Sequence, residues 1–124
     1  MRSVLAIALL CIASPALASN WAPFFDCGQG ENVRHYSYDQ SSIQRRGDFL
    51  LVKIAGDYSG LRDSRAQKVR MVFAIDCNGR TYHQERRVEY RANGRVIARY
   101  SSPTPPMTIS SPGIGQNLFE RVCA

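Results

Sequence analysis

The feature that most constrains the fold is a stretch of strict alternation near the middle of the chain. In residues 69–76 every second side chain is large and apolar: Val69, Met71, Phe73 and Ile75. A period of two with β-branched and aromatic residues indicates a strand that buries one face. The run is followed by Asn78-Gly79, a pair that suits the two-residue turn of a hairpin. The sequence therefore predicts an antiparallel hairpin here.

The turn also sets a register for that hairpin. The expected facing pairs are Cys77 with Arg80, Ile75 with Tyr82, Phe73 with Gln84 and Val69 with Val88. These pairs give one mostly apolar face. A second Asn-Gly pair, Asn93-Gly94, predicts another turn, so we expect residues 81–92 and 95–101 to pair as the next step of a meander.

The segments before this hairpin carry weaker patterns. Residues 33–38 and the strongly apolar residues 48–57 are expected strands. Residues 39–47 carry turn-forming residues around Ile43, which predicts a turn or a single helical turn that points Ile43 inward. Residues 21–32, which contain Pro23 and two glycines, are interpreted as an irregular lead-in.

The C-terminal part predicts a helix. Residues 102–112 hold four of the six prolines and are expected to form an extended crossover. Ser111 then suits an N-cap, Pro112 suits the first helical position, and apolar residues follow at four-residue intervals: Ile114, Leu118 and Val122. Strands first and a helix last predict an α+β domain, with about five to six antiparallel strands and the helix packed on one face.

The N-terminus has the layout of a secretory signal. Arg2 precedes an apolar run over residues 4–12, and a small-residue site, Ala16-Leu17-Ala18, follows. We expect residues 1–18 to be cleaved, which leaves residues 19–124 as a single domain. Lipoprotein processing at Cys11 is disfavoured because Leu10 precedes it, so a membrane anchor is not expected.

Cleavage would leave three cysteines: Cys27, Cys77 and Cys123. In an oxidising compartment two of them should form a disulfide and the third should stay free or seek an outside partner. The cysteines form no C-x-x-C pair, and His35 and His83 are far from each other and from any cysteine in the sequence. The sequence therefore predicts neither a metal site nor a cofactor site.

Several short motifs occur in an order that resembles a known family. They are Trp21, Tyr38-Asp39, Ser42-Ile43, Gly47, Ile75-Asp76-Cys77, Tyr90, Pro112-Gly113 and Val122-Cys123. This order resembles the surface-adhesin protein E family of exported proteins from Gram-negative bacteria. The resemblance implies an antiparallel sheet with a C-terminal helix tethered by a disulfide between Cys77 and Cys123, which leaves Cys27 without a partner. It also implies a non-enzymatic binding protein, because the founding adhesin binds host matrix proteins.

Arginine is concentrated in the expected hairpin between residues 80 and 99. The candidate ligand-contacting residues there are Arg80, Arg86, Arg87, Arg91, Arg95 and Arg99, together with Tyr90. Guanidinium groups on a rigid sheet can bind carboxylates or sulfates in bidentate fashion. The alternative is a solvated face on which these arginines pair with Glu85 and Glu89 across strands, for little energy.

The chain has sixteen Lys plus Arg against ten Asp plus Glu, a balance that favours anionic partners and also keeps an exported domain soluble. Host extracellular-matrix proteins or anionic glycans are the expected partners, in the periplasm, outside the cell or at its surface. Export argues against nucleic acid as a partner.

Two other functions compete with that of a binding module. The first is a periplasmic envelope protein or inhibitor that binds a protein partner. The second is a small basic secreted nuclease, in which His35 and His83 would act as base and acid while Lys53 or an arginine stabilises phosphate charge. The sequence contains no G-x-S-x-G, H-E-x-x-H or phosphate-loop motif, so no catalytic motif supports an enzyme.

Overall fold

The computed structural model describes residues 18–110 and 112–123. The expected signal peptide, apart from Ala18, lies outside the described residues, as do Cys11 and the expected N-cap Ser111. Among the described residues, no helix is long and apolar enough to cross a bilayer.

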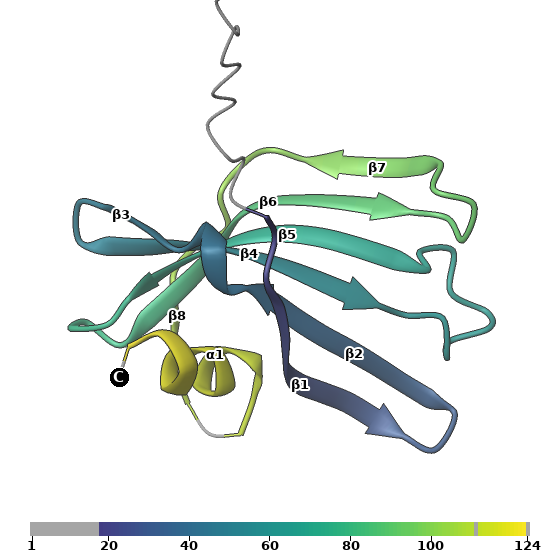
Figure 1. The fold of residues 1–124 in the computed structure, drawn as a ribbon, viewed down its shortest axis with the longest axis horizontal. Helices are drawn as coiled ribbons and strands as arrows, with labels where there is room; N and C mark the ends of the chain where they lie inside the picture. The colour runs from purple at the N-terminus through teal and green to yellow at the C-terminus, as the bar shows by residue number, and fades with distance from the viewer. Residues whose placement is uncertain (1–17, 111, 124) are drawn as a thin grey trace, which may run out of the picture.

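Within the described part of the chain, one antiparallel sheet is followed by one α-helix (Figure 1). The strands are β1 (Trp21–Gln29), β2 (Asn32–Asp39), β3 (Gln44–Arg46), β4 (Phe49–Asp57), β5 (Lys68–Asp76), β6 (Thr81–Tyr90), β7 (Val96–Tyr100) and β8 (Met107–Thr108). A 3-10 turn, η1 (Gln40–Ser42), joins β2 to β3, and the helix is α1 (Ile114–Val122). The main path of the sheet runs β1-β2-β4-β5-β6-β7, while β3 pairs with β4 and β8 pairs with β6. The expected α+β architecture is confirmed.

The central hairpin of β5 and β6 follows the expected register near its turn and departs from it further along. Ile75 faces Tyr82 and Phe73 faces Gln84, as expected. A bulge at Glu85 then shifts the pairing by one residue, so Val69 faces Glu89 and the expected pairing with Val88 is wrong. The bulge places Arg86 and Arg87 on the faces opposite to those that an unbroken ladder would give them.

The turn of this hairpin is also built differently from the expected two-residue turn. The positive φ falls on Arg80, at 54°, and not on Asn78 or Gly79. The Oδ1 atom of Asp76 accepts a hydrogen bond from the backbone N–H of Gly79 at 2.8 Å. This hydrogen bond stabilises a turn longer than two residues. The residue with the left-handed conformation is Arg80, which directly precedes β6.

Two expectations for the N-terminal half are wrong. Residues expected as an irregular lead-in form the edge strand β1, in which a register shift between Pro23 and Phe25 accommodates the proline. The expected single helical turn is present as η1, but Ile43 is 36% exposed instead of pointing inward. Ile43 leads directly into β3, whose three residues are all exposed.

The helix packs on one face of the sheet and completes the core. α1 begins after Gly113, so Pro112 precedes the helix and does not form its first turn. The largest fully buried side chains are Ile54, Ile75, Leu118, Val52 and Val69. Burying each such side chain contributes about 1.5–3 kcal/mol to stability. The Cys77–Cys123 disulfide ties the end of the helix to the end of β5, as the family resemblance implied, and Cys27 is free and exposed.

Candidate ligand-binding surface

The face of the sheet opposite the helix carries a regular arrangement of cations. Lys53 of β4 and Arg86 of β6 both face Val72 of β5, one from each side. Directly paired residues in a sheet point to the same face, so these three side chains form one row across the strands. The two cationic stems in this row lie two strands apart, which corresponds to about 10 Å.

A second row lies two residues further along the strands and carries cations at the alternate positions. Arg70 of β5 faces Ala55 of β4 on one side and Val88 of β6 on the other. Val88 in turn faces Arg99 of β7. Cations therefore alternate with small apolar residues in both directions over four strands. We call the four cations Lys53, Arg70, Arg86 and Arg99 the basic face.

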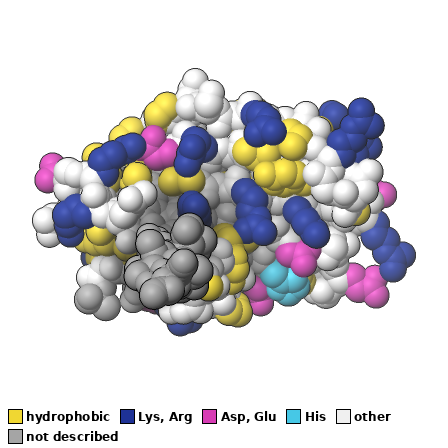
Figure 2. Space-filling model, turned by 45° about the horizontal axis from the view of Figure 1, so that its top comes forward, with side chains coloured by type: hydrophobic (Ala, Val, Ile, Leu, Met, Phe, Trp, Pro, Cys, Tyr) yellow, Lys and Arg dark blue, Asp and Glu magenta, His cyan; other side chains and the backbone are white. Residues whose placement is uncertain are grey.

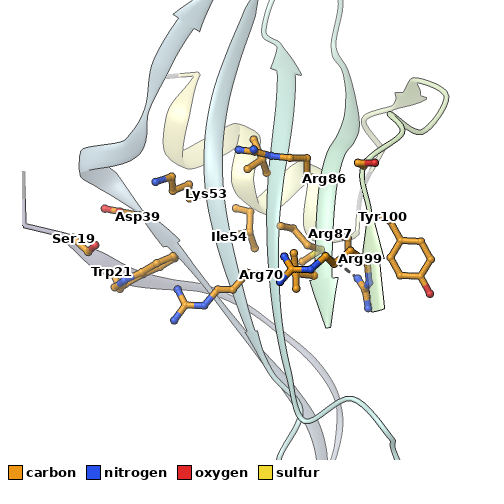
Figure 3. A pocket seen from close by; sticks show the side chains of 14 residues that line it. Ser19, Trp21, Asp39, Lys53, Ile54, Arg70, Arg86, Arg87, Arg99 and Tyr100 are labelled. Carbon is orange, nitrogen blue, oxygen red and sulfur yellow. Dashed lines mark hydrogen bonds between the residues drawn. The ribbon is translucent and has the colours of Figure 1, made fainter. Parts of the chain in front are cut away.

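The basic face borders a groove of about 500 Å³ (Figure 3). Ser19, Trp21 and Asp39 line one side of the groove, and Tyr100 and Ser101 line the other. Figure 2 shows Lys and Arg side chains interspersed with hydrophobic ones on this side of the molecule. The groove therefore combines positive charge with apolar surface.

The N-terminal segment forms the aromatic wall of the groove and is held there by hydrogen bonds. The backbone N–H of Asn20 donates to Oδ1 of Asp39 at 2.9 Å, and the backbone N–H of Gln40 donates to the carbonyl of Asn20 at 2.9 Å. Trp21, the next residue, lies with its ring centre 4.7 Å from the guanidinium carbon of Arg70. This cation–π contact fixes Trp21 beside the basic face.

Asp39 is the single carboxylate among the groove-lining residues, and its charge is stabilised locally. Its Oδ1 atom accepts hydrogen bonds from the hydroxyl and the backbone N–H of Ser41, at 2.6 and 3.0 Å, and from Asn20. These hydrogen bonds, the one from the Ser41 hydroxyl first, lower the pKa of the Asp39 carboxyl. Asp39 is therefore ionised at neutral pH and holds the groove wall in place.

The acidic residues of the hairpin do not neutralise the basic face. Glu85 forms an ion pair with Arg46 and accepts a hydrogen bond from His83, and Glu89 forms an ion pair with Arg87. The hydrogen bond from His83, followed by that from Arg46, lowers the pKa of Glu85. Within residues 18–110 and 112–123, no ion pair involves any of the four cations of the basic face. Their charge is available to a ligand.

The structure distributes the arginines of the predicted hairpin over several surroundings. Arg86 and Arg99 belong to the basic face, whereas Arg80 lies 4.5 Å from the centre of the Phe119 ring, at the helix. Arg91 and Arg95 are exposed around the β6–β7 turn. Tyr90 is half-buried and faces Lys68 of β5.

Arg87 also lines the groove, although its side chain leaves β6 on the face opposite to that of Arg86. It faces buried Met71, and its Nε–H donates to Oε2 of Glu89 at 2.9 Å. Its guanidinium also lies 3.5 Å from the hydroxyl of Tyr58. Arg87 is therefore half-buried and largely engaged within the fold.

Sequence reasoning did not place Trp21, Lys53 or Arg70 in the ligand-contacting surface, and it named Lys53 only in the nuclease hypothesis. Arg70 and Lys53 occupy the polar positions of the two most regular strands, and this alternation was the available signal. Only strand pairing brings them beside Arg86. Trp21 could not be placed from the sequence, because its strand was not recognised.

The two histidines of the nuclease hypothesis lie far apart. His35 faces Asp57, which faces Lys68 of β5, whereas His83 faces Ala74 of the same strand. The separation of six residues along β5, from position 68 to position 74, corresponds to about 20 Å of strand. The two imidazoles therefore cannot act on one phosphate. Among the described residues, no group of three or more His, Cys, Asp or Glu side chains is arranged to hold a metal ion.

The fold and this surface define a small disulfide-tethered α+β domain that presents a basic face on a rigid sheet. The chain matches the model for surface-adhesin protein E over residues 21–124 and belongs to that family. No curated protein and no solved structure matches it. The family resemblance derived from the sequence motifs is thereby confirmed.

Proposed function

We propose that this chain is exported by cleavage after Ala18 and acts as a non-enzymatic, adhesin-type binding module. The support comes from the signal-like layout of residues 1–18 and from membership of the surface-adhesin protein E family. The module acts outside the cytoplasm, where the Cys77–Cys123 disulfide is stable. Its partners are host extracellular-matrix proteins or anionic glycans.

The contact surface in this proposal is the basic face. The observation that carries it is the double row in which Lys53 and Arg86 alternate with Arg70 and Arg99, none of which forms an ion pair with another described residue. A sheet holds the cationic stems at fixed spacing, so little backbone ordering is needed when a ligand binds. Arginine forks also form bidentate hydrogen bonds with carboxylates and sulfates.

The test compares two triple charge reversals of equal net charge. R70E/R86E/R99E removes most of the basic face, whereas R45E/R91E/R95E reverses three exposed arginines elsewhere. Binding to immobilised heparin and to matrix proteins is measured at several salt concentrations. We expect the first variant to lose at least about tenfold in affinity and to show a weaker salt dependence, with the second close to wild type. Equal losses in both variants would mean that net charge alone drives binding and would contradict the proposal.

A further inference from the structure

The groove contains three kinds of group that a simple anion would not use. Trp21 forms an aromatic wall, Val72 and Val88 lie between the cations, and Asp39 contributes a carboxylate. We propose that the groove binds an acidic sugar, a ring that carries a sulfate or carboxylate group, with the sugar ring against Trp21. This inference rests on the proposed function, because it assigns a ligand class to the basic face.

Trp21 provides the flat surface that a sugar ring needs, on the face of the ring that Arg70 does not cover. Figure 3 shows its ring nearly edge-on, with Arg70 on one side and Lys53 on the other. The Asn20 hydrogen bonds and the Arg70 contact fix this orientation before a ligand arrives. Sugar rings present flat C–H faces, and an apolar aromatic surface beside a few well-placed polar groups is the usual form of a small-molecule site. An acidic group on the sugar would then lie among the cations.

Asp39 argues for a ligand that carries hydroxyl groups as well as negative charge. All three hydrogen bonds of this carboxylate end on Oδ1, and no hydrogen bond within the described chain reaches Oδ2. Asp39 is only 4% exposed but lines the groove, so Oδ2 is the carboxylate atom that remains to accept a hydrogen bond from a ligand hydroxyl. A ligand that carries only negative charge would be repelled by this carboxylate, whereas a sugar hydroxyl would be bound by it.

The position of the groove disfavours an extended acidic peptide. The floor of the groove lies over β4, β5 and β6, and the backbone groups of these strands already pair with neighbouring strands; the edge strands β1 and β7 contribute only to its two sides. A peptide lying across the groove would find no backbone partners there, and buried backbone N–H and C=O groups need them. Peptides that bind sheets usually add to an edge strand instead. A sugar requires only side-chain partners, and these are what the groove provides.

Trp21 also provides the readout, because it is the only tryptophan in the sequence. Intrinsic fluorescence is recorded while a heparin-derived sulfated disaccharide is titrated into the purified mature domain. Maltose, inorganic sulfate and an octaglutamate peptide serve as comparison ligands. We expect a saturable change in Trp21 emission with the sulfated disaccharide, and no change with the other three at equal concentration. Tighter binding of octaglutamate would overturn the assignment to sugars.

Two substitutions of Trp21 test the stacking directly, with affinity measured by calorimetry and folding checked by thermal unfolding. W21F keeps an aromatic ring and should bind the disaccharide nearly as well as wild type. W21L keeps apolar bulk without the ring and should bind about tenfold more weakly, the size of one lost stacking contact. If W21L binds as tightly as wild type while R70E/R86E/R99E does not bind, the sugar-stacking inference fails and the proposed function stands. If neither heparin nor matrix proteins bind the wild-type domain, the proposed function itself fails.

Discussion

Gly115 of α1 lies against the ring of Tyr82, so closely that a Cβ atom at position 115 would be 2.8 Å from Cδ1 of that ring. Glycine usually weakens a helix, and here the close approach explains its presence in the first turn. Gly115 is buried, and Tyr82 packs against the hydrophobic core. The helix therefore reaches the sheet at a point where even one extra methyl group has no space.

We predict that Gly115→Ala destabilises the domain although alanine is the better helix former. Alanine gains about 1 kcal/mol of helix propensity, but overpacking a rigid ring costs about 1–3 kcal/mol. Thermal unfolding should show a lower Tm for the variant. In a Tyr82→Leu background, which removes the ring, the same substitution should cost less or become stabilising. Equal effects in both backgrounds would show that the ring contact is not the cause.

The disulfide should contribute a large share of the stability of such a small domain. Cys77 and Cys123 are separated by 46 residues, and closing a loop of that size contributes about 4 kcal/mol in the chain-entropy model. We expect the double variant C77A/C123A to unfold at much lower denaturant concentration. Cys27→Ser, at an exposed free cysteine, is the control and should match wild type. A comparable loss in the control would indicate that Cys27 has a structural role.

The fold was predictable where a strong local pattern coincided with the tertiary structure. The alternation in residues 69–76 and the four-residue spacing in α1 both reflect one buried face, so they identified β5 and the helix correctly. The bulge at Glu85 was not predictable, because β6 carries polar residues on both faces and gives no alternation to locate a shift. β1 was hidden by Pro23 and Gly28, which an edge strand tolerates because one side of its backbone is not paired.

The candidate site could be predicted only in part, because it depends on the pairing register of the strands. Local density of arginine singled out the hairpin, but density says nothing about which face each side chain occupies. The bulge exchanges the faces that Arg86 and Arg87 occupy, and strand pairing adds Lys53 and Arg70 from more than ten residues away. Which side chains share a surface across neighbouring strands depends on the pairing register. An error of one residue in the predicted register moves every side chain of that strand to the other face of the sheet.

Asp39 makes the N-terminal wall of the groove sensitive to acid. Its pKa is lowered in the folded protein, so its contribution to stability is complete above its ordinary pKa and is lost as the pH falls through the lower, folded value. Loss should therefore occur below about pH 4. We expect Asp39→Asn to be less stable than wild type at pH 7, with the difference shrinking toward pH 3. Asp48→Asn, at an exposed aspartate outside the groove, is the control and should be as stable as wild type at pH 7.

The neighbours Arg86 and Arg87 should give opposite results when each is replaced by alanine, because they lie on opposite faces of β6. Arg86 is exposed on the basic face, so Arg86→Ala should change the free energy of unfolding by no more than about 0.5 kcal/mol while weakening heparin binding. Arg87→Ala leaves half-buried Glu89 without its ion-pair partner and removes the contact with Tyr58. Leaving such a group unpaired costs about 1–3 kcal/mol, which lowers the Tm of a domain of this size by several degrees. Denaturant titration and heparin binding, measured on both variants, separate the two roles. If Arg87→Ala were as stable as wild type and lost binding instead, Arg87 would belong to the ligand-binding surface and not to the structural network.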